Sequence, residues 1–156
     1  MAAINPKIAY CSISGYGQDG PYSHLAGHDI NYLGYAGVRE QIGPEGGDPV
    51  IPNFQIADLL GGALTAAMGI LAVVLEAQRT GQGRAIDVSM TDSVLAHTQF
   101  TMLLLTDAGA PAPRGADLLS GGLPCYGVYR CADGRHMAVG ALEGKFWKIC
   151  CGVLER

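Results

Sequence analysis

The sequence predicts an α/β layered fold, and the order of its segments carries that prediction. Short β-rich runs at residues 7–14 and 84–89 alternate with apolar helical segments at residues 56–80 and 91–105. An order of strand, helix, strand and helix favours layers in which helices cover a sheet. The chain has 156 residues, 49% of them hydrophobic, which is enough to bury a sizeable core.

The first elements follow from local composition. The run KIAYCSIS at residues 7–14 ends in a GYG tripeptide, which predicts a buried strand that enters a turn. Residues 25–35 have apolar residues at helical spacing, and we expect a helix there. Residues 37–53 contain three prolines and four glycines. That composition is typical of a loop that crosses the surface or lines a site.

Residues 56–80 form the strongest predicted helix. The cationic Arg79 and the following Gly81 suit a helix C-terminus. Residues 59–75 are apolar enough to raise the question of a membrane span. This stretch is near the lower length limit for spanning and is interrupted by glycines. We therefore predict a buried core helix.

The second half of the chain predicts a connector and a hairpin. Residues 108–124 are rich in Gly, Ala and Pro, as expected for a connector into a different unit. Residues 126–131 and 136–140 flank the tetrapeptide ADGR, which is a hairpin signal. A last helix is expected to begin near Gly144.

Composition excludes several function classes. Charged residues make up 15% of the chain and the net charge is −4, so no basic field is available for nucleic acid or an anionic membrane. The five cysteines are odd in number and contain no C-x-x-C pair, which argues against a disulfide framework or a zinc site. The opening residues reach Pro6 before an apolar signal region forms. We expect a cytoplasmic or organelle-matrix protein.

Two motifs suggest chemistry only weakly. The glycines at residues 15–20 match G-x-G-x-x-G after a predicted strand, but no strand ending in an acidic residue follows about twenty residues on. A tight turn is the favoured interpretation. His24 and His28 would share one face of a helix, as metal ligands often do. Asp29 or Asp58 could serve as a third ligand. The glutamate of metalloproteases is missing there, however, and we predict no metal site.

Asp58, at the start of the apolar helix, is the strongest candidate for chemistry. An isolated carboxylate at that location is usually an N-terminal capping group. The apolar stretch after Asp58 predicts a partly desolvated carboxylate instead. Gly61 and Gly62 would remove side-chain bulk where a ligand could approach the helix. Glu143 is another carboxylate in a hydrophobic neighbourhood.

Three runs of sequence, in order over nearly the whole chain, carry a resemblance to a known family. They are SGYGQDGPYSHLAGHDINYLGYAGV, ADLLGGALTAAMGILAVVLEAQRTGQGRAIDVSMTDSV and GGLPCYGVYRCADGRHMAVGALEGKFW. Together they closely resemble α-methylacyl-CoA racemases of the family III CoA-transferase (CaiB/BaiF) superfamily. The resemblance implies an internal fragment of a longer protein. Residues 1–107 would be part of a Rossmann-like large domain, residues 108–124 a linker, and residues 125–156 the start of a smaller α+β domain.

The resemblance also implies roles for individual residues. The catalytic histidine of the family lies in a GHD-x-N-Y motif, which maps to His28. The catalytic aspartate lies in an AD-x-x-GG motif, which maps to Asp58, and an assisting glutamate in AVGA-x-E maps to Glu143. The backbone N–H of Asp29 is expected to serve the enolate oxygen, and Tyr32 is expected to lie along the CoA path.

The implied activity is racemisation or epimerisation at the α-carbon of 2-methylacyl-CoA thioesters, a reaction of lipid metabolism. It needs a base on one face of the carbon and an acid on the other, whose roles exchange in the reverse direction. CoA enters as part of the substrate, so no separate cofactor is expected. The full-length family member is expected to be a homodimer, in the cytoplasm, or in a mitochondrion or peroxisome of a eukaryotic cell.

Two alternatives stay open. In the same superfamily, an aspartate at the position of Asp58 attacks acyl-CoA and forms a covalent anhydride, which passes CoA between acids. The resemblance places the histidine of the GHD motif with racemases and not with transferases. The other alternative is a chain that catalyses nothing by itself. The apolar final segment, with Phe146 and Trp147, has nothing after it to pack against, so we expect further sequence or another subunit to cover it.

Overall fold

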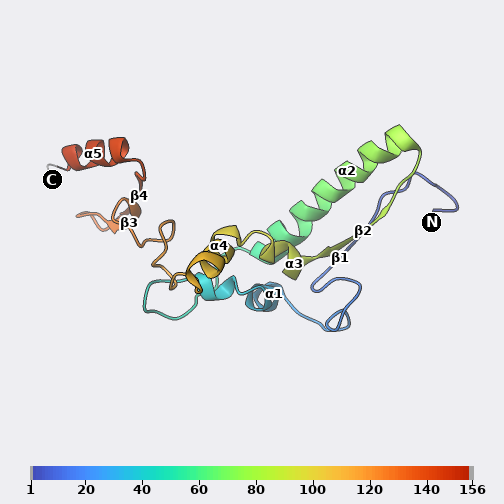
Figure 1. The fold of residues 1–156 in the computed structure, drawn as a ribbon, viewed down its shortest axis with the longest axis horizontal. Helices are drawn as coiled ribbons and strands as arrows, with labels where there is room; N and C mark the ends of the chain where they lie inside the picture. The colour runs from blue at the N-terminus through green and yellow to red at the C-terminus, as the bar shows by residue number, and fades with distance from the viewer. Residues whose placement is uncertain (1, 155–156) are drawn as a thin grey trace.

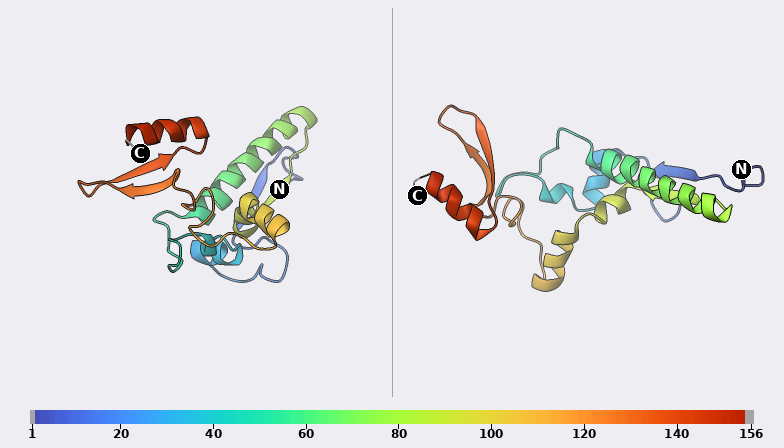
Figure 2. Two further views of the ribbon diagram at one scale, coloured as in Figure 1. Left: turned by 60° about the vertical axis from the view of Figure 1, so that its left-hand side comes forward. Right: turned by 90° about the horizontal axis from the view of Figure 1, so that it is seen from above.

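The computed structural model describes residues 2–154 as an elongated arrangement of helices and two small sheets. In Figure 1 the N-terminal strand and a long helix lie at one end, the short helices α1, α3 and α4 lie in the middle, and a hairpin with the C-terminal helix lies at the other end. Figure 2 shows the same separation from two further directions.

Two parallel strands form the first sheet. Strand β1 (Tyr10–Ser14) pairs with β2 (Ala85–Ser89), with Tyr10 opposite Ala85 and Ser14 opposite Ser89. Parallel neighbours need a long crossover connection, and here it contains the helical elements between the two strands. The prediction of an α/β fold is confirmed, and both predicted strands form, each with a later start than the sequence indicated.

The crossover contains one continuous helical stretch. A π-helical segment, η2 (Ala57–Leu64), leads directly into α2 (Thr65–Thr80). The stretch ends at Gly81, whose φ of 77° lies in the left-handed region that glycine adopts without steric cost. The predicted helix over residues 56–80 and its glycine stop are therefore confirmed.

The expectation that this helix is buried in the core is only half right. By length and composition the stretch Ala57–Thr80 could also span a membrane, although a soluble core helix passes the same test. One face packs against the two-stranded sheet, where Gly69 lies against the Ile86 side chain. The other face exposes Leu64, Met68, Leu71 and Leu75. A pair of strands covers one side of a helix only, which explains the difference.

A small core holds the middle of the molecule together. Helix α1 (Asp29–Tyr35) contributes buried Leu33, η2 contributes Ala57, and α3 (Met90–Leu95) contributes Val94. Helix α1 is shorter than the predicted residues 25–35 because His28 takes the N-cap position with extended backbone angles. The predicted loop of residues 37–53 follows and contains one turn of 3-10 helix, η1 (Arg39–Gln41).

The single helix predicted for residues 91–105 is wrong. The chain forms α3 and then α4 (Gln99–Ala108), with a break between them. At the break, the Thr98 hydroxyl donates to the carbonyl of Leu95 at 2.7 Å, and the His97 Nδ1 lies 2.7 Å from the carbonyl of Ser93. Side chains that bond to the last carbonyls of a helix compete with its continuation.

The hairpin unit, defined as residues 126–153, contains the second sheet and the last helix. Strands β3 (Tyr126–Arg130) and β4 (His136–Gly140) pair antiparallel, and α5 (Gly144–Val153) follows. The hairpin prediction and the predicted start of the last helix at Gly144 are confirmed. The division into domains at residues 107 and 125 stays a prediction.

Candidate active site

The side chain of Asp29 joins the two segments that carry the candidate residues. Asp29 is the first residue of α1, and its Oδ1 accepts hydrogen bonds from the backbone N–H groups of Ala57 at 2.6 Å and Asp58 at 3.0 Å. The residue is 7% exposed and is the one buried charged side chain among residues 2–154. These bonds bring His28 and Asp58, which are thirty positions apart in the sequence, to neighbouring helix starts.

His28 is held through its backbone. Its N–H donates to Oδ1 of Asn31 at 3.0 Å, and its carbonyl accepts from the N–H groups of Asn31 and Tyr32. The residue itself is exposed. Because its backbone N–H and its carbonyl are both hydrogen-bonded at the start of α1, the position of the His28 Cα is defined. The imidazole stays accessible from solvent.

Asp58 lies inside the first turn of η2 and is exposed. The expectation of a desolvated carboxylate is therefore wrong for this chain, because none of the described segments covers that side of the helix start. Asp58 is also not the capping group, since the acceptor for the first N–H groups is the carboxylate of Asp29. A negative charge in the first turn is favoured by the helix dipole.

The interpretation of Gly61 and Gly62 as room for a ligand is wrong. Both residues are buried against α3. A Cβ at Gly61 would lie 2.7 Å from the carbonyl oxygen of Met90 and 2.9 Å from Val94, and one at Gly62 would lie 3.1 Å from the Met90 sulfur. The two glycines allow η2 to pack closely on α3, which a residue with a side chain prevents.

Tyr32 is buried beneath this site. Its hydroxyl donates to the carbonyl of Gly27 at 2.5 Å, and its ring meets Tyr16 edge to face with centroids 5.3 Å apart. Burial raises the pKa of the Tyr32 hydroxyl, and the nearby Tyr16 and Asp58 raise it further. Tyr32 thus has a packing role in this structure. Its predicted place on the CoA path stays a prediction.

Glu143 lies apart from the other candidate residues. It is the exposed N-cap of α5, between β4 and α5 of the hairpin unit, whereas His28 precedes α1 in the middle of the molecule (Figure 1). Within residues 2–154 the structure does not bring Glu143 to His28. The assisting role of Glu143 stays a prediction.

The two weaker motifs find no support in the local geometry. Residues 15–20 form a loop in which Gln18 N–H donates to Oδ2 of Asp87 at 2.7 Å, and no helix opens at this loop, as dinucleotide binding would require. His24 lies in a turn before α1, so it does not share a helix face with His28. Among the described residues, no three His, Cys, Asp or Glu side chains are grouped to hold a metal ion.

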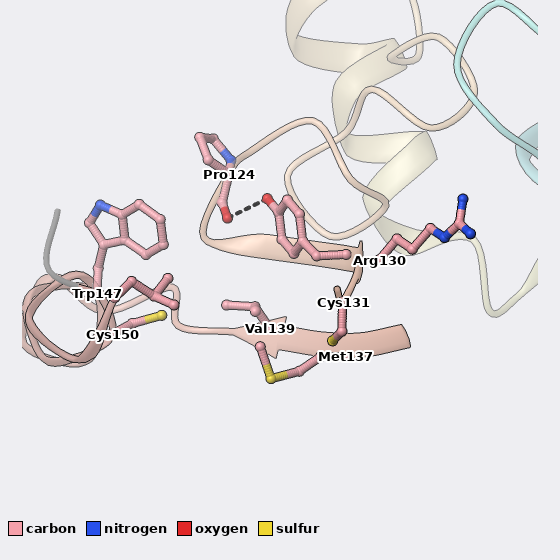
Figure 3. A pocket seen from close by; sticks show the side chains of 9 residues that line it. Pro124, Arg130, Cys131, Met137, Val139, Trp147 and Cys150 are labelled. Carbon is pink, nitrogen blue, oxygen red and sulfur yellow. Dashed lines mark hydrogen bonds between the residues drawn. The ribbon is translucent and has the colours of Figure 1, made fainter. Parts of the chain in front are cut away.

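An apolar pocket of about 490 Å³ lies among β3, β4 and α5 of the hairpin unit. Figure 3 shows Trp147 and Cys150 of α5 on one side and Val139 and Met137 of β4 nearby. The Tyr129 hydroxyl donates to the carbonyl of Pro124 at 2.6 Å at its edge. None of the predicted catalytic residues lines this pocket.

Sequence reasoning missed the bridging role of the Asp29 carboxylate, since it considered only the backbone N–H of Asp29 and a possible metal ligand. A general signal was available, because an acidic residue needs hydrogen-bond donors if it is buried. The donors are backbone groups of a distant helix start, which no local pattern identifies.

Comparison with known proteins places the chain in a family. The family model of CoA-transferase family III matches residues 1–156. Alpha-methylacyl-CoA racemase of Homo sapiens is 42% identical over 145 residues, which are 93% of this chain and 38% of that protein. Succinyl-CoA:glutarate CoA-transferase of Mus musculus is 36% identical over 153 residues, 97% of this chain and 34% of that protein.

A solved structure agrees with the same fold. A CAIB/BAIF family protein from Brucella suis superposes with a TM-score of 0.80 at 25% sequence identity, covering 99% of this chain and 40% of that one. The chain thus spans well under half the length of the relatives it matches. With a family model that matches throughout and a confirmed α/β architecture, the chain belongs to CoA-transferase family III.

Proposed function

We propose that this chain carries the catalytic pair of an acyl-CoA racemase, which inverts the α-carbon of 2-methylacyl-CoA thioesters. The observation that carries the proposal is the Asp29 bridge, which holds the start of the helix after His28 against the start of the helix that contains Asp58. An accessible imidazole and an accessible carboxylate at adjoining helix starts suit a two-base proton transfer.

The reaction requires more than a proton acceptor. An α-proton next to a thioester is far less acidic than any side chain, and a gap of roughly 10 pKa units corresponds to about 14 kcal/mol. Hydrogen-bond donors that meet the enolate oxygen lower this barrier. The backbone N–H of Asp29 is the proposed donor, because the first N–H groups of a helix have no partner inside the helix.

His28 and Asp58 would act on opposite faces of the α-carbon. One removes the α-proton, the electrons of the C–H bond form the C=C bond of the enolate, and the carbonyl electrons move to oxygen. The other then donates a proton to the opposite face, and the C=O bond forms again. No oxidant, reductant or separate cofactor is needed, because CoA is part of the substrate.

Glu143 enters this proposal through a second copy of the chain. It is the N-cap of α5 in the hairpin unit, whereas His28 is the N-cap of α1, and these two helices lie apart in the chain (Figure 1). A carboxylate that restrains the His28 imidazole must therefore come from a neighbouring subunit if Glu143 provides it. We propose a homodimer in which the hairpin unit of one copy reaches the α1 region of the other.

A CoA-transferase is the second candidate function. Its support is the 36% identity to a succinyl-CoA:glutarate CoA-transferase and the exposure of the Asp58 carboxylate. In that reaction Asp58 attacks the thioester carbonyl, the C–S bond breaks, CoA thiolate leaves, and an aspartyl anhydride forms. An acid acceptor is then required to take up CoA.

Solvent deuterium distinguishes the two functions. The protein is mixed with a 2-methylacyl-CoA in deuterated water, without any acid acceptor, and the substrate is followed by mass spectrometry. A racemase incorporates one deuteron at the α-carbon, and His28→Ala or Asp58→Asn abolishes the incorporation. A transferase incorporates none and moves CoA only when an acid such as glutarate is added. Transfer without α-exchange would replace the racemase proposal.

A further inference from the structure

We infer that the carboxylate of Asp29 is the positioning residue that sets the separation between His28 and Asp58. This inference rests on the proposed racemase function. It concerns the side chain, whereas the function proposed above uses the backbone N–H of the same residue. The carboxylate is directed into the protein, toward Ala57 and the start of η2.

The geometry leaves little slack between the two candidate groups. His28 directly precedes Asp29 in the chain, and one of the two donors to Asp29 is the backbone N–H of Asp58 itself. His28 and Asp58 are thus connected through the side chain of Asp29 and one hydrogen bond of 3.0 Å. A displacement of the Asp29 carboxylate changes the distance between the imidazole and the Asp58 carboxylate directly.

Burial and charge make the bridge stiff. A buried carboxylate needs donors, and Asp29 obtains two from backbone groups that start the helical stretch Ala57–Thr80. Those N–H groups have no partner inside their own helix, and the helix dipole favours a negative charge at that end. Ala57 is fully buried against Leu33 and Val94, so packing fixes the donors in place.

The test separates the acceptor from the charge. Both hydrogen bonds end on Oδ1, so Asp29→Asn keeps an acceptor of the same shape and Asp29→Ala removes it. We expect Asp29→Ala to lower kcat for α-deuterium exchange on the order of a hundredfold. KM should stay close to that of the unchanged protein, because the carboxylate is buried and its Oδ1 faces backbone N–H groups of the protein. Asp29→Asn should restore most of the lost rate.

A second readout does not depend on activity. Amide hydrogen exchange of residues 56–60, followed by mass spectrometry, reports the two bridging N–H groups. It should accelerate in Asp29→Ala and stay slow in Asp29→Asn. Ser89→Ala is the matched control. The Ser89 hydroxyl accepts a capping hydrogen bond from the Asp92 N–H at 3.2 Å at the start of α3, and the substitution removes that bond. Its α-exchange rate should match that of the unchanged protein.

Each outcome decides the inference. A folded Asp29→Ala variant with unchanged kcat, or an Asp29→Asn variant that loses the rate while residues 56–60 stay protected, overturns it. If Asp29→Ala does not fold, the Asp29→Asn result alone decides, since the retained acceptor must retain both rate and protection. If the unchanged protein exchanges no α-proton, the proposed function fails, and the protection data still test the bridge.

Discussion

The region around α1, η2 and α3 differs from the hairpin unit in how completely its apolar residues are buried. In the first region Leu33 and Val94 are 1% and 2% exposed and pack against Ala57. In residues 126–153 Ala141 is the one buried hydrophobic residue, while Val128 is 70% exposed. A closed core therefore fixes the relative positions of His28 and Asp58, whereas Glu143 is fixed only relative to its own hairpin.

The candidate site depends on two kinds of stabilisation. Residues near the Asp29 bridge are held by contacts within the chain. The hairpin unit has regular strands and a helix, but its apolar surface, which includes Ile149 and Val153, is left open. Large exposed apolar patches mark surfaces that bind a partner, in agreement with the homodimer proposed above.

The largest effect is expected from a substitution that disrupts the core of the first region. Leu33→Ala removes a side chain that is almost fully buried and leaves a cavity, so the free energy of unfolding should fall by about 2–5 kcal/mol. Val128→Ala in the hairpin unit should change it by less than about 0.5 kcal/mol. Urea unfolding of both variants measures the difference. Equal losses would contradict the contrast between the two regions.

A smaller loss is expected where η2 packs on α3. Gly61→Ala places a Cβ within 2.7 Å of a backbone carbonyl oxygen, and overpacking of this kind costs about 1–3 kcal/mol. Gly34→Ala is the control on the surface of α1, where an added Cβ meets nothing within 4 Å, and it should stabilise the protein by about 0.5–1 kcal/mol. Thermal unfolding compares the two. A stabilised Gly61→Ala variant would show that the helices are not in close contact.

Arg114, in the segment that precedes the hairpin unit, is bonded to the loop of residues 37–53 that follows α1. Its guanidinium donates to the Glu40 carbonyl at 2.7 Å, to the Glu40 carboxylate at 2.6 Å and to the Gly47 carbonyl. Arg114→Ala should cost about 1 kcal/mol and speed proteolysis within residues 37–53. Arg114→Lys keeps the charge without the fork of donors, so it should be cleaved almost as fast. Unchanged cleavage rates in both variants would show that Arg114 does not restrain residues 37–53.

The smallest effects are expected from two ion pairs at the surface, one at the end of α2 and one in the hairpin unit. A hydrogen bond from the Arg84 side chain lowers the pKa of Glu76, and one from the Arg135 side chain lowers the pKa of Asp133. A carboxyl group whose pKa is lowered in the folded state stabilises the folded protein at pH values above its ordinary pKa, which is 4.5 for Glu and 3.8 for Asp. That contribution is lost as the pH falls through the folded-state pKa.

The free energy of unfolding, measured as a function of pH on the acid side, compares these two ion pairs. Glu76→Gln and Asp133→Asn should each flatten the acid side of the stability curve slightly, and added salt should remove the difference from the unchanged protein. Glu76 is expected to matter more, because its pair links the end of α2 to Arg84 just before β2, whereas the Asp133 pair lies within one turn. A larger effect at Asp133 would reverse this order.

Local patterns predicted the elements well where a residue type alone decides the backbone. The left-handed Gly81 ends the long helix at the predicted position, and the ADGR turn forms the predicted hairpin. The pattern failed at residues 91–105, because apolar spacing continues through a point where Thr98 and His97 bond to the preceding carbonyls. Side-chain bonds of this kind depend on rotamers that periodicity does not report.

The sequence named the candidate site residues but not their geometry, and their catalytic roles stay predictions. His28 and Asp58 were identified from their motifs, and the structure brings their helices together. The surroundings of Asp58 were misjudged, since an apolar sequence after a carboxylate does not specify which face of the helix is covered. The two glycines after it serve helix packing.

The strands, the long helix with its glycine stop, and the hairpin follow from the sequence, because each depends on neighbours a few positions away. Only the tertiary structure decided that the Asp29 carboxylate bridges to Asp58 and that Glu143 lies apart from His28. Both facts depend on the packing of segments that are distant in the chain, where burial and hydrogen-bond geometry select the partners.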